Sequence, residues 1–243
     1  MQCICTTQDI KKLGTILGVW AHPDDELFSM GGIMAAAIQN GQTVVCITAT
    51  RGEAGVQDEK RWPKDKLAEI RTEELEKSYD ILGAQHHYWL DYADGCCKDC
   101  DCEDAVTRIA RLIQKYQPDS VLTFGPDGMT GHDDHKTVCD WAAKAVKEAE
   151  SKAKIYEVIY TEPQYQALLD VDKKFNIFFN IDKPDVCQKA NCAIYFELND
   201  EQYEKKLEAL KAMPSQTEAM MKMFGSSLRA GIGIEAFSNE RAR

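Results

Sequence analysis

Short apolar runs alternate with longer amphipathic segments along most of the chain, and this alternation indicates the fold class. The runs predict strands at residues 16–20, 43–48, 87–90, 120–124, 155–160 and 175–181. Apolar residues at helical spacing predict helices at residues 27–40, 67–82, 103–116, 134–149 and 199–223, the last interrupted at Pro214. Strands that alternate with helices form βαβ units. We therefore expect an α/β, Rossmann-like fold with a mainly parallel sheet flanked by helices.

The length of 243 residues fits a single domain over residues 1–243, with residues 226–243 expected as a loop-rich tail or arm. A formal net charge of -11 argues against nucleic acid and anionic membranes as partners, because both require clustered lysine and arginine. The absence of a long apolar run and of a targeting segment in residues 1–12 predicts a cytoplasmic protein, in which the ten cysteines are reduced. The sequence leaves the oligomeric state open, a homo-oligomer included.

Two polar segments follow predicted strands directly. His22-Pro23-Asp24-Asp25-Glu26 follows the first strand, and Gly131-His132-Asp133-Asp134-His135 follows the fourth. In open parallel sheets the crevice beyond the carboxyl ends of the strands binds the ligand. Zinc hydrolases commonly use three histidine and carboxylate ligands and leave one position for water. We therefore expect a metal site at this edge of the sheet.

The residue types within the two segments indicate how the chemistry is divided. Asp24 and Asp25 are neighbours on a tight turn, so one carboxylate can bind metal while the other accepts a proton from water. His132 and His135 share one face if they begin a helix. One imidazole can bind metal, and the other can stabilise an oxyanion or protonate a leaving nitrogen.

The motifs together resemble those of the LmbE-like family, also called PIG-L deacetylases. The resemblance rests on AHPDDE at residues 21–26, TRGEAG at residues 50–55 and GHDDH at residues 131–135, and it extends to RTEEL at residues 71–75 and to Ser215-Gln216. It implies a Rossmann-like domain that hydrolyses N-acyl bonds, typically the acetyl amide of N-acetylglucosamine conjugates. The implied partner is thus a small-molecule amino-sugar conjugate.

The resemblance also implies individual roles. It makes His22, Asp25 and His135 the zinc (Zn²⁺) ligands, Asp24 the general base, His132 the oxyanion stabiliser or general acid, and Asp134 a partner that orients an imidazole. Arg71 and Asp94 match positions that contact the sugar in relatives, and Arg51 is expected to face the same pocket. A nitrogen–oxygen site with an open position also accepts Fe²⁺. Glu26 is expected to serve the first helical turn rather than catalysis.

Three other hypotheses remain open at this point. The first is a metal-dependent amidase that acts on a thiol conjugate or another non-sugar amide. The second is a non-haem iron oxygenase, which also uses two histidines and a carboxylate, although such a site does not need the extra carboxylate present here. The third is a non-catalytic or redox metal protein whose working part is the cluster Cys96, Cys97, Cys100 and Cys102, which can hold a second metal or form a redox pair.

Overall fold

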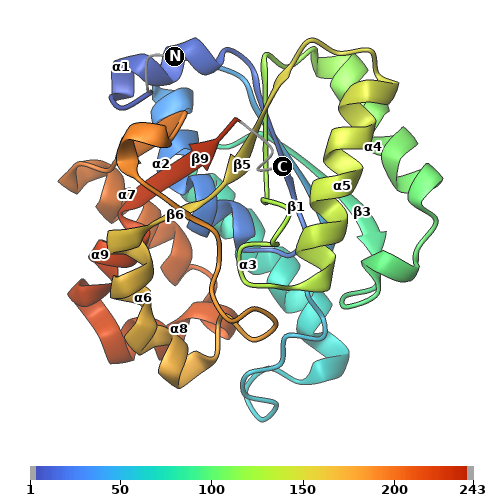
Figure 1. The fold of residues 1–243 in the computed structure, drawn as a ribbon. Helices are drawn as coiled ribbons and strands as arrows, with labels where there is room; N and C mark the ends of the chain where they lie inside the picture. The colour runs from blue at the N-terminus through green and yellow to red at the C-terminus, as the bar shows by residue number, and fades with distance from the viewer. Residues whose placement is uncertain (1–3, 240–243) are drawn as a thin grey trace.

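The computed structural model describes residues 4–239, and a seven-stranded sheet lies at the centre of these residues (Figure 1). The strands are β1 Ile16–Trp20, β2 Val44–Thr50, β3 His86–Tyr92, β4 Ser120–Thr123, β5 Lys154–Val158, β6 Tyr160–Thr161, β7 Val186–Cys187, β8 Ile194–Glu197 and β9 Ile234–Ser238. Their order across the main sheet is β3-β2-β1-β4-β5-β9-β8, and β6 pairs separately with β7. The first five strands run parallel, whereas β9 runs antiparallel to both of its neighbours.

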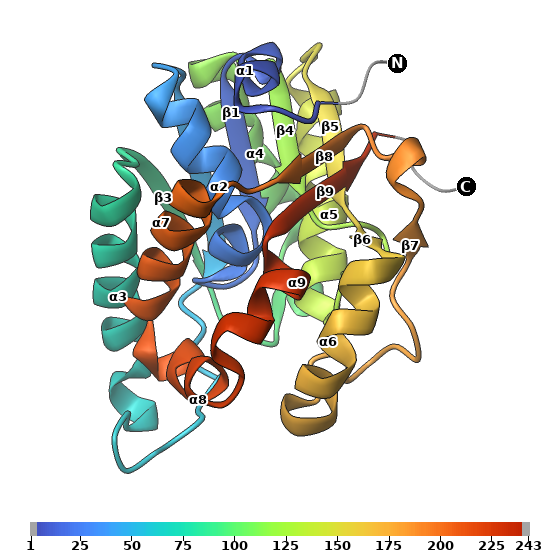
Figure 2. The same cartoon turned by 90° about the vertical axis from the view of Figure 1, so that its left-hand side faces the viewer.

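Helices cover both faces of the sheet (Figures 1 and 2). They are α1 Thr7–Ile10, α2 Asp25–Gln39, α3 Leu67–Leu82, α4 Cys102–Tyr116, α5 Asp133–Glu148, α6 Glu162–Phe175, α7 Asp200–Lys211, α8 Pro214–Phe224 and α9 Arg229–Ile232. Short 3₁₀ turns occupy Lys11–Leu13, Lys64–Lys66, Cys97–Asp99, Lys189–Asn191 and Gly225–Leu228. On one face α7 packs against α2 and α3, and on the other α4 packs against α5. No helix in the described part of the chain is long and apolar enough to cross a membrane.

The strand order places a crevice at the end of β1. All residues of β1 and β2 are buried, because helices cover both faces of this part of the sheet. From β1 the chain adds β2 and β3 on one side, whereas β4 and β5 lie on the other, so the order reverses between β1 and β4. The carboxyl ends of strands at such a reversal bound the ligand site of α/β proteins. His22 follows β1, and His132 follows β4.

The predicted α/β class and mainly parallel sheet are confirmed. The predicted strands at residues 16–20, 43–48, 87–90, 120–124 and 155–160 correspond to β1 to β5, although the last ends at residue 158 and a separate β6 follows. The predicted helices correspond to α2, α3, α4, α5 and the pair α7 and α8, with the break immediately before Pro214.

The strand predicted at residues 175–181 is wrong. This region contains the end of α6, a helix that the periodicity did not predict, and Asn176 closes it with a left-handed φ of 50°. Phe178 then packs against the rings of Tyr160 and Tyr165. Phe178 is therefore buried against neighbouring side chains, whereas Phe179 is exposed, and the run does not pair as a strand.

The loop-rich tail predicted at residues 226–243 is also wrong as far as residue 239. The segment forms α9 and β9, and β9 lies between β5 and β8 in the main sheet. The hydrophobicity pattern did not predict β9 because its second residue is Glu235, and a buried carboxylate is rare unless it is paired.

Glu235 is paired, and its pairing connects three elements. Its carboxylate accepts hydrogen bonds of 2.7 Å from the backbone N–H groups of Gly32 and Ile33, where α2 is kinked at Met30. The ammonium of Lys206 on α7, which like Glu235 is fully enclosed, lies 2.8 Å from the same carboxylate. Burial raises the pKa of Glu235 and lowers that of Lys206, and their mutual attraction opposes both shifts. The pair thus fixes α2 and α7 against β9.

We predict that Lys206→Met lowers the free energy of unfolding by about 3–5 kcal/mol, because it leaves a buried carboxylate without its cation. Urea unfolding followed by circular dichroism measures the change. Lys205→Met is the matched control, since Lys205 is the exposed neighbour on the same helix and its loss should cost almost nothing. Equal stability of the two variants would contradict the account of this pair.

Candidate metal centre and active site

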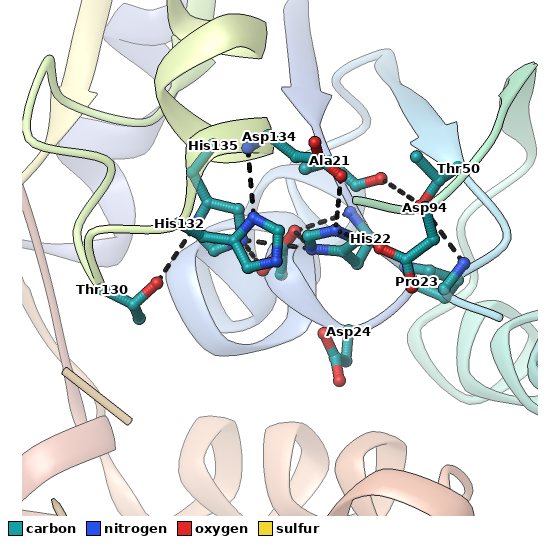
Figure 3. A network of polar contacts seen from close by, with 12 residues as sticks. Ala21, His22, Pro23, Asp24, Thr50, Asp94, Thr130, His132, Asp134 and His135 are labelled. Atoms are coloured by element: carbon teal, nitrogen blue, oxygen red, sulfur yellow. Dashed lines mark hydrogen bonds and ion pairs between the residues drawn. The ribbon is translucent and has the colours of Figure 1, made fainter. Parts of the chain in front are cut away.

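Two helix starts deliver the predicted site residues to the crevice between β1 and β4 (Figure 3). The chain leaves β1 through His22, and Asp24 is the residue before α2, held at a φ of 114° that a non-glycine residue rarely adopts. This strained turn separates the side chain of Asp24 from that of Asp25. His132 precedes α5, and His135 lies in its first turn.

Three of the predicted ligands bring their atoms together. His22 Nδ1 lies 3.1 Å from His135 Nε2 and 3.5 Å from one carboxylate oxygen of Asp25, whose other oxygen lies 3.4 Å from His135 Nε2. Ligands at about 2.05 Å around a tetrahedral zinc ion lie about 3.3 Å from one another. Each pair of these residues therefore has atoms at about the spacing of two ligands on one metal ion, with Asp25 facing the two histidines through different oxygens.

The far side of His22 determines which of its nitrogens can bind metal. His22 Nε2 lies 3.0 Å from Asp94 Oδ1 and 3.3 Å from Asp134 Oδ2. Ionised carboxylates only accept hydrogen bonds, so Nε2 carries a proton and Nδ1 is the nitrogen that faces Asp25 and His135 and can bind a metal. Burial would lower the pKa of His22, but hydrogen bonds to Asp134, Asp25 and Asp94 raise it well above the ordinary value, so a metal would displace a proton from Nδ1 when it binds.

His135 is oriented in the same way from its other nitrogen. His135 Nδ1 lies 2.9 Å from the carbonyl oxygen of Gly128, and the hydroxyl of Thr130 lies 3.3 Å away. The carbonyl accepts the Nδ1 proton, so the Nε2 lone pair faces His22 and Asp25. Burial lowers the pKa of His135 to about 4, which keeps this ring neutral, the form that binds a metal.

Two other sets of side chains, neither of which contains Asp25, each offer one ligand atom per residue, and these atoms all lie within 4.8 Å of one another. One is His22, His132 and His135, and the other is His22, Asp94, His132 and Asp134. In the second set the carboxylates are already used: Asp134 accepts the backbone N–H groups of Gly95 and Cys97, and Asp94 accepts that of Ala54. These bonds favour a role as hydrogen-bond acceptors for His22 over a role as metal ligands.

The loop that contains the four clustered cysteines contacts the site through a backbone N–H group. Within the described residues, no group of three metal-ligating side chains includes any of them. Their sulfur atoms have different partners: Cys100 Sγ donates to the carbonyl of Cys96, and Cys102 Sγ lies near the ammonium of Lys144. The loop instead supplies the Cys97 N–H that helps to hold Asp134.

Asp24 lies apart from the imidazoles (Figure 3), and its carboxylate contacts Arg71. Arg71 Nη2 lies 3.2 Å from Asp24 Oδ2, and Arg71 Nη1 donates to the carbonyl of Gly52 at 2.8 Å. A Cβ at Gly52 would lie 2.1 Å from this guanidinium, so only glycine allows the approach. Burial raises the pKa of Asp24 to about 7 despite the nearby Arg71. Glu26 is buried outside the cleft and accepts the backbone N–H of Asp24, which positions the turn.

His132 presents a proton to the cleft. Its Nδ1 accepts the backbone N–H of Asp134 at 3.1 Å, so in the neutral ring the proton is on Nε2. Burial and the neighbouring His22 lower the pKa of His132, which favours this neutral form. His132 can therefore donate one hydrogen bond to a bound molecule without carrying a full charge.

A polar cleft of about 290 Å³ joins these groups. It is lined by His22, Asp24, Ala54, Gly55, Arg71, Asp94, Gly95, His132 and Gln216. The sequence had assigned no role to Gln216, whose amide donates to the carbonyl of Gly55 and which α8 brings in from far along the chain. In the sequence, the polar pair Ser215-Gln216 after Pro214 is the feature that could have indicated a binding role for Gln216. Arg51 does not line the cleft, because its guanidinium binds Asp91 and stacks on Trp89.

Comparison with known proteins agrees with this geometry. The family model described as PIG-L, GlcNAc-PI de-N-acetylase, matches residues 17–146, which is more than half of the chain and includes both motifs. The chain belongs to the PIG-L family. A curated relative in Kineococcus radiotolerans, 1D-myo-inositol 2-acetamido-2-deoxy-alpha-D-glucopyranoside deacetylase, is 31% identical over 195 residues, which is 63% of this chain and 54% of that protein. This PIG-L protein thus spans about half the length of such relatives.

Solved structures show the same fold at low sequence identity. N,N'-diacetylchitobiose deacetylase from Pyrococcus horikoshii has a TM-score of 0.65 and 22% identity, over 96% of this chain and 85% of that one. The 4-carboxy-2-hydroxymuconate hydratase from Pseudomonas putida has a TM-score of 0.56 and 20% identity, over 95% and 97%. Since this PIG-L fold is shared by a deacetylase and a hydratase, the reaction must be argued from the site.

We predict that Asp134→Asn weakens zinc binding about 10–100-fold, because the carboxylate that orients His22 is replaced by an amide. Competition with a chromogenic chelator measures the affinity. Asp133→Asn is the control, since Asp133 is half-exposed on the same turn and pairs with Lys98. If the two variants bind zinc equally, Asp134 does not orient the ligand.

Proposed function

We propose that the protein is a metal-dependent hydrolase that removes an acyl group from the nitrogen of an amino-sugar conjugate. The observation that carries this proposal is the convergence of His22 Nδ1, Asp25 and His135 Nε2, with a separate carboxylate and a separate imidazole donor facing the adjoining cleft. A metal site that only stored or transferred electrons would not need those two additional groups.

His22, Asp25 and His135 would hold the metal, for which we propose zinc, with ferrous iron as the alternative in the cell. Gly128 orients the ring of His135, and Asp94 and Asp134 orient that of His22. The imidazole nitrogens that then face Asp25 suit either ion. When bound, such a metal polarises the amide carbonyl and lowers the pKa of water toward 7.

Asp24 is proposed to accept the proton of the attacking water. Its carboxylate lines the cleft, and the contact with Arg71 directs one oxygen and leaves the other available. Because the N-cap turn holds it at a fixed backbone angle, the base is positioned before the substrate arrives.

His132 is proposed to act on the other side of the scissile bond. Its Nε2–H can donate to the carbonyl oxygen as negative charge develops there. His132 keeps this proton, because losing it would leave an imidazolate; the leaving nitrogen instead takes the proton that Asp24 received from water, so that the amine departs in neutral form. The backbone N–H of Asp134 holds the ring in position to stabilise the oxyanion.

The polar cleft is proposed to take the sugar. Arg71, Gln216 and the backbone of residues 54 and 55 offer donors and acceptors for hydroxyl groups. Asp94 lines the same wall, although its carboxylate also holds His22. We propose that one cytoplasmic domain carries out the whole reaction, and that its substrate is a glucosamine conjugate comparable to the one named for the Kineococcus relative. A thiol conjugate or another amide is the alternative substrate.

A panel of N-acylglucosamine glycosides, assayed for amine release, tests the proposal. We expect hydrolysis to stop when the protein is treated with a chelator and dialysed, because Asp24 alone is too weak a base to deprotonate water whose pKa no metal has lowered, and to return when zinc or ferrous iron is added back. Full activity of the metal-free protein would contradict a metal-dependent mechanism. Oxygen consumption without amine release would indicate an oxygenase instead.

We predict that Asp24→Asn lowers kcat about 10²–10⁴-fold and leaves the metal content unchanged, because the amide cannot accept the proton of water. Amine release and metal analysis are measured on the same preparation, with Asp133→Asn as the control that retains activity. If Asp24→Asn stays fully active, another group is the base.

A further inference from the structure

A second hollow, separate from the polar cleft, borders the metal ligands. It is an apolar cavity of about 200 Å³ whose wall includes Asp25 and His135, whereas His22 faces the polar cleft. The two hollows share no lining residue, so the three ligands lie between them. The cavity is enclosed by side chains of α2, β5, α6, α8 and α9, among them Phe28, Val158, Leu168, Val171, Met220 and Ile232.

Two polar side chains of the cavity wall, those of Glu235 and Gln164, form their hydrogen bonds with other groups of the protein. Glu235 is occupied by Lys206 and by two backbone N–H groups of α2. The amide of Gln164 bonds to Thr161 and to the carbonyl of Ile234. Apart from the metal ligands at one end, the wall thus offers mainly hydrocarbon, and water gains few hydrogen bonds there.

The volume is too large for an acetyl group. A cavity of about 150 Å³ lined by apolar side chains binds benzene, which has six carbons. A single methyl group would leave most of this larger cavity empty, and an empty apolar cavity forfeits contacts that a chain would make. The cavity suits an unbranched chain of about four to eight carbons.

The position of the cavity identifies which part of a substrate would fill it. In an amide held at the metal centre, the nitrogen carries the sugar and the carbonyl carbon carries the acyl chain. The sugar needs the hydrogen-bonding groups of the polar cleft, so the chain points toward Asp25 and His135. We propose that this cavity binds the acyl chain of the substrate, and that the chain is a medium-length alkanoyl group rather than acetyl. This inference rests on the proposed N-acyl hydrolase function.

The test uses methyl glycosides of glucosamine that carry acetyl, butanoyl, hexanoyl, octanoyl or dodecanoyl groups on nitrogen. With zinc-loaded protein, kcat/KM should rise from acetyl to hexanoyl by up to roughly fourfold for each added methylene, and fall once the chain exceeds the cavity. Chelator-sensitive hydrolysis that is fastest for acetyl would overturn this inference and leave the proposed function intact.

A variant that fills the cavity gives a second readout. Val171→Phe adds volume from α6 into the cavity and should lower the hexanoyl-to-acetyl ratio of kcat/KM at least tenfold. Leu169→Phe adds a ring on the same helix outside the cavity wall and should preserve the ratio. An unchanged ratio in a folded Val171→Phe protein would overturn the inference.

Calorimetry separates the inference from the reaction. If no glycoside is hydrolysed, the proposed function fails, and binding of the hexanoyl and acetyl glycosides is compared directly. Tighter binding of the hexanoyl compound, lost in Val171→Phe and kept in Leu169→Phe, would support the cavity as a chain site. Equal binding of the two compounds would overturn it.

Discussion

The two nitrogens of His22 face opposite environments, and the proposed chemistry depends on this difference. On one side Asp94 and Asp134 accept the Nε2 proton, and on the other Nδ1 meets Asp25 and His135. Without these two acceptors, the proton of a neutral ring could move to Nδ1, and this nitrogen would then have no lone pair for a metal. Most of the remaining architecture serves to hold this one ring: the cysteine-rich loop binds Asp134, and the start of α2 places Asp25.

The fold explains how these groups are held in place. The reversal of strand order between β1 and β4 brings two helix starts to one crevice. The buried Lys206–Glu235 pair then secures the kinked α2 against β9, so that the turn at Asp24 can sustain an unfavourable backbone angle. Two hollows of opposite polarity remain beside the ligands, and they suggest how a substrate with a sugar at one end and a chain at the other would be aligned.

The sequence alone predicted the parts of this arrangement that depend on local pattern. Alternating strands and helices indicated the sheet, and the two motifs after strands indicated the metal site. Long-range contacts were not predictable in this way. Gln216 reaches the cleft only because α8 brings it back to Gly55. The strand β9 contains the charged residue Glu235, whose partner Lys206 lies on α7. Arg51 does not reach the cleft because its guanidinium contacts Trp89 and Asp91.

The most direct test is a crystal structure of the zinc-soaked protein with anomalous diffraction at the zinc edge. The account predicts a single strong peak within about 2.0–2.2 Å of His22 Nδ1, His135 Nε2 and an oxygen of Asp25. A peak on the Nε2 side of His22, between Asp94 and Asp134, would contradict the account. It would mean that these carboxylates are ligands and do not orient the ring.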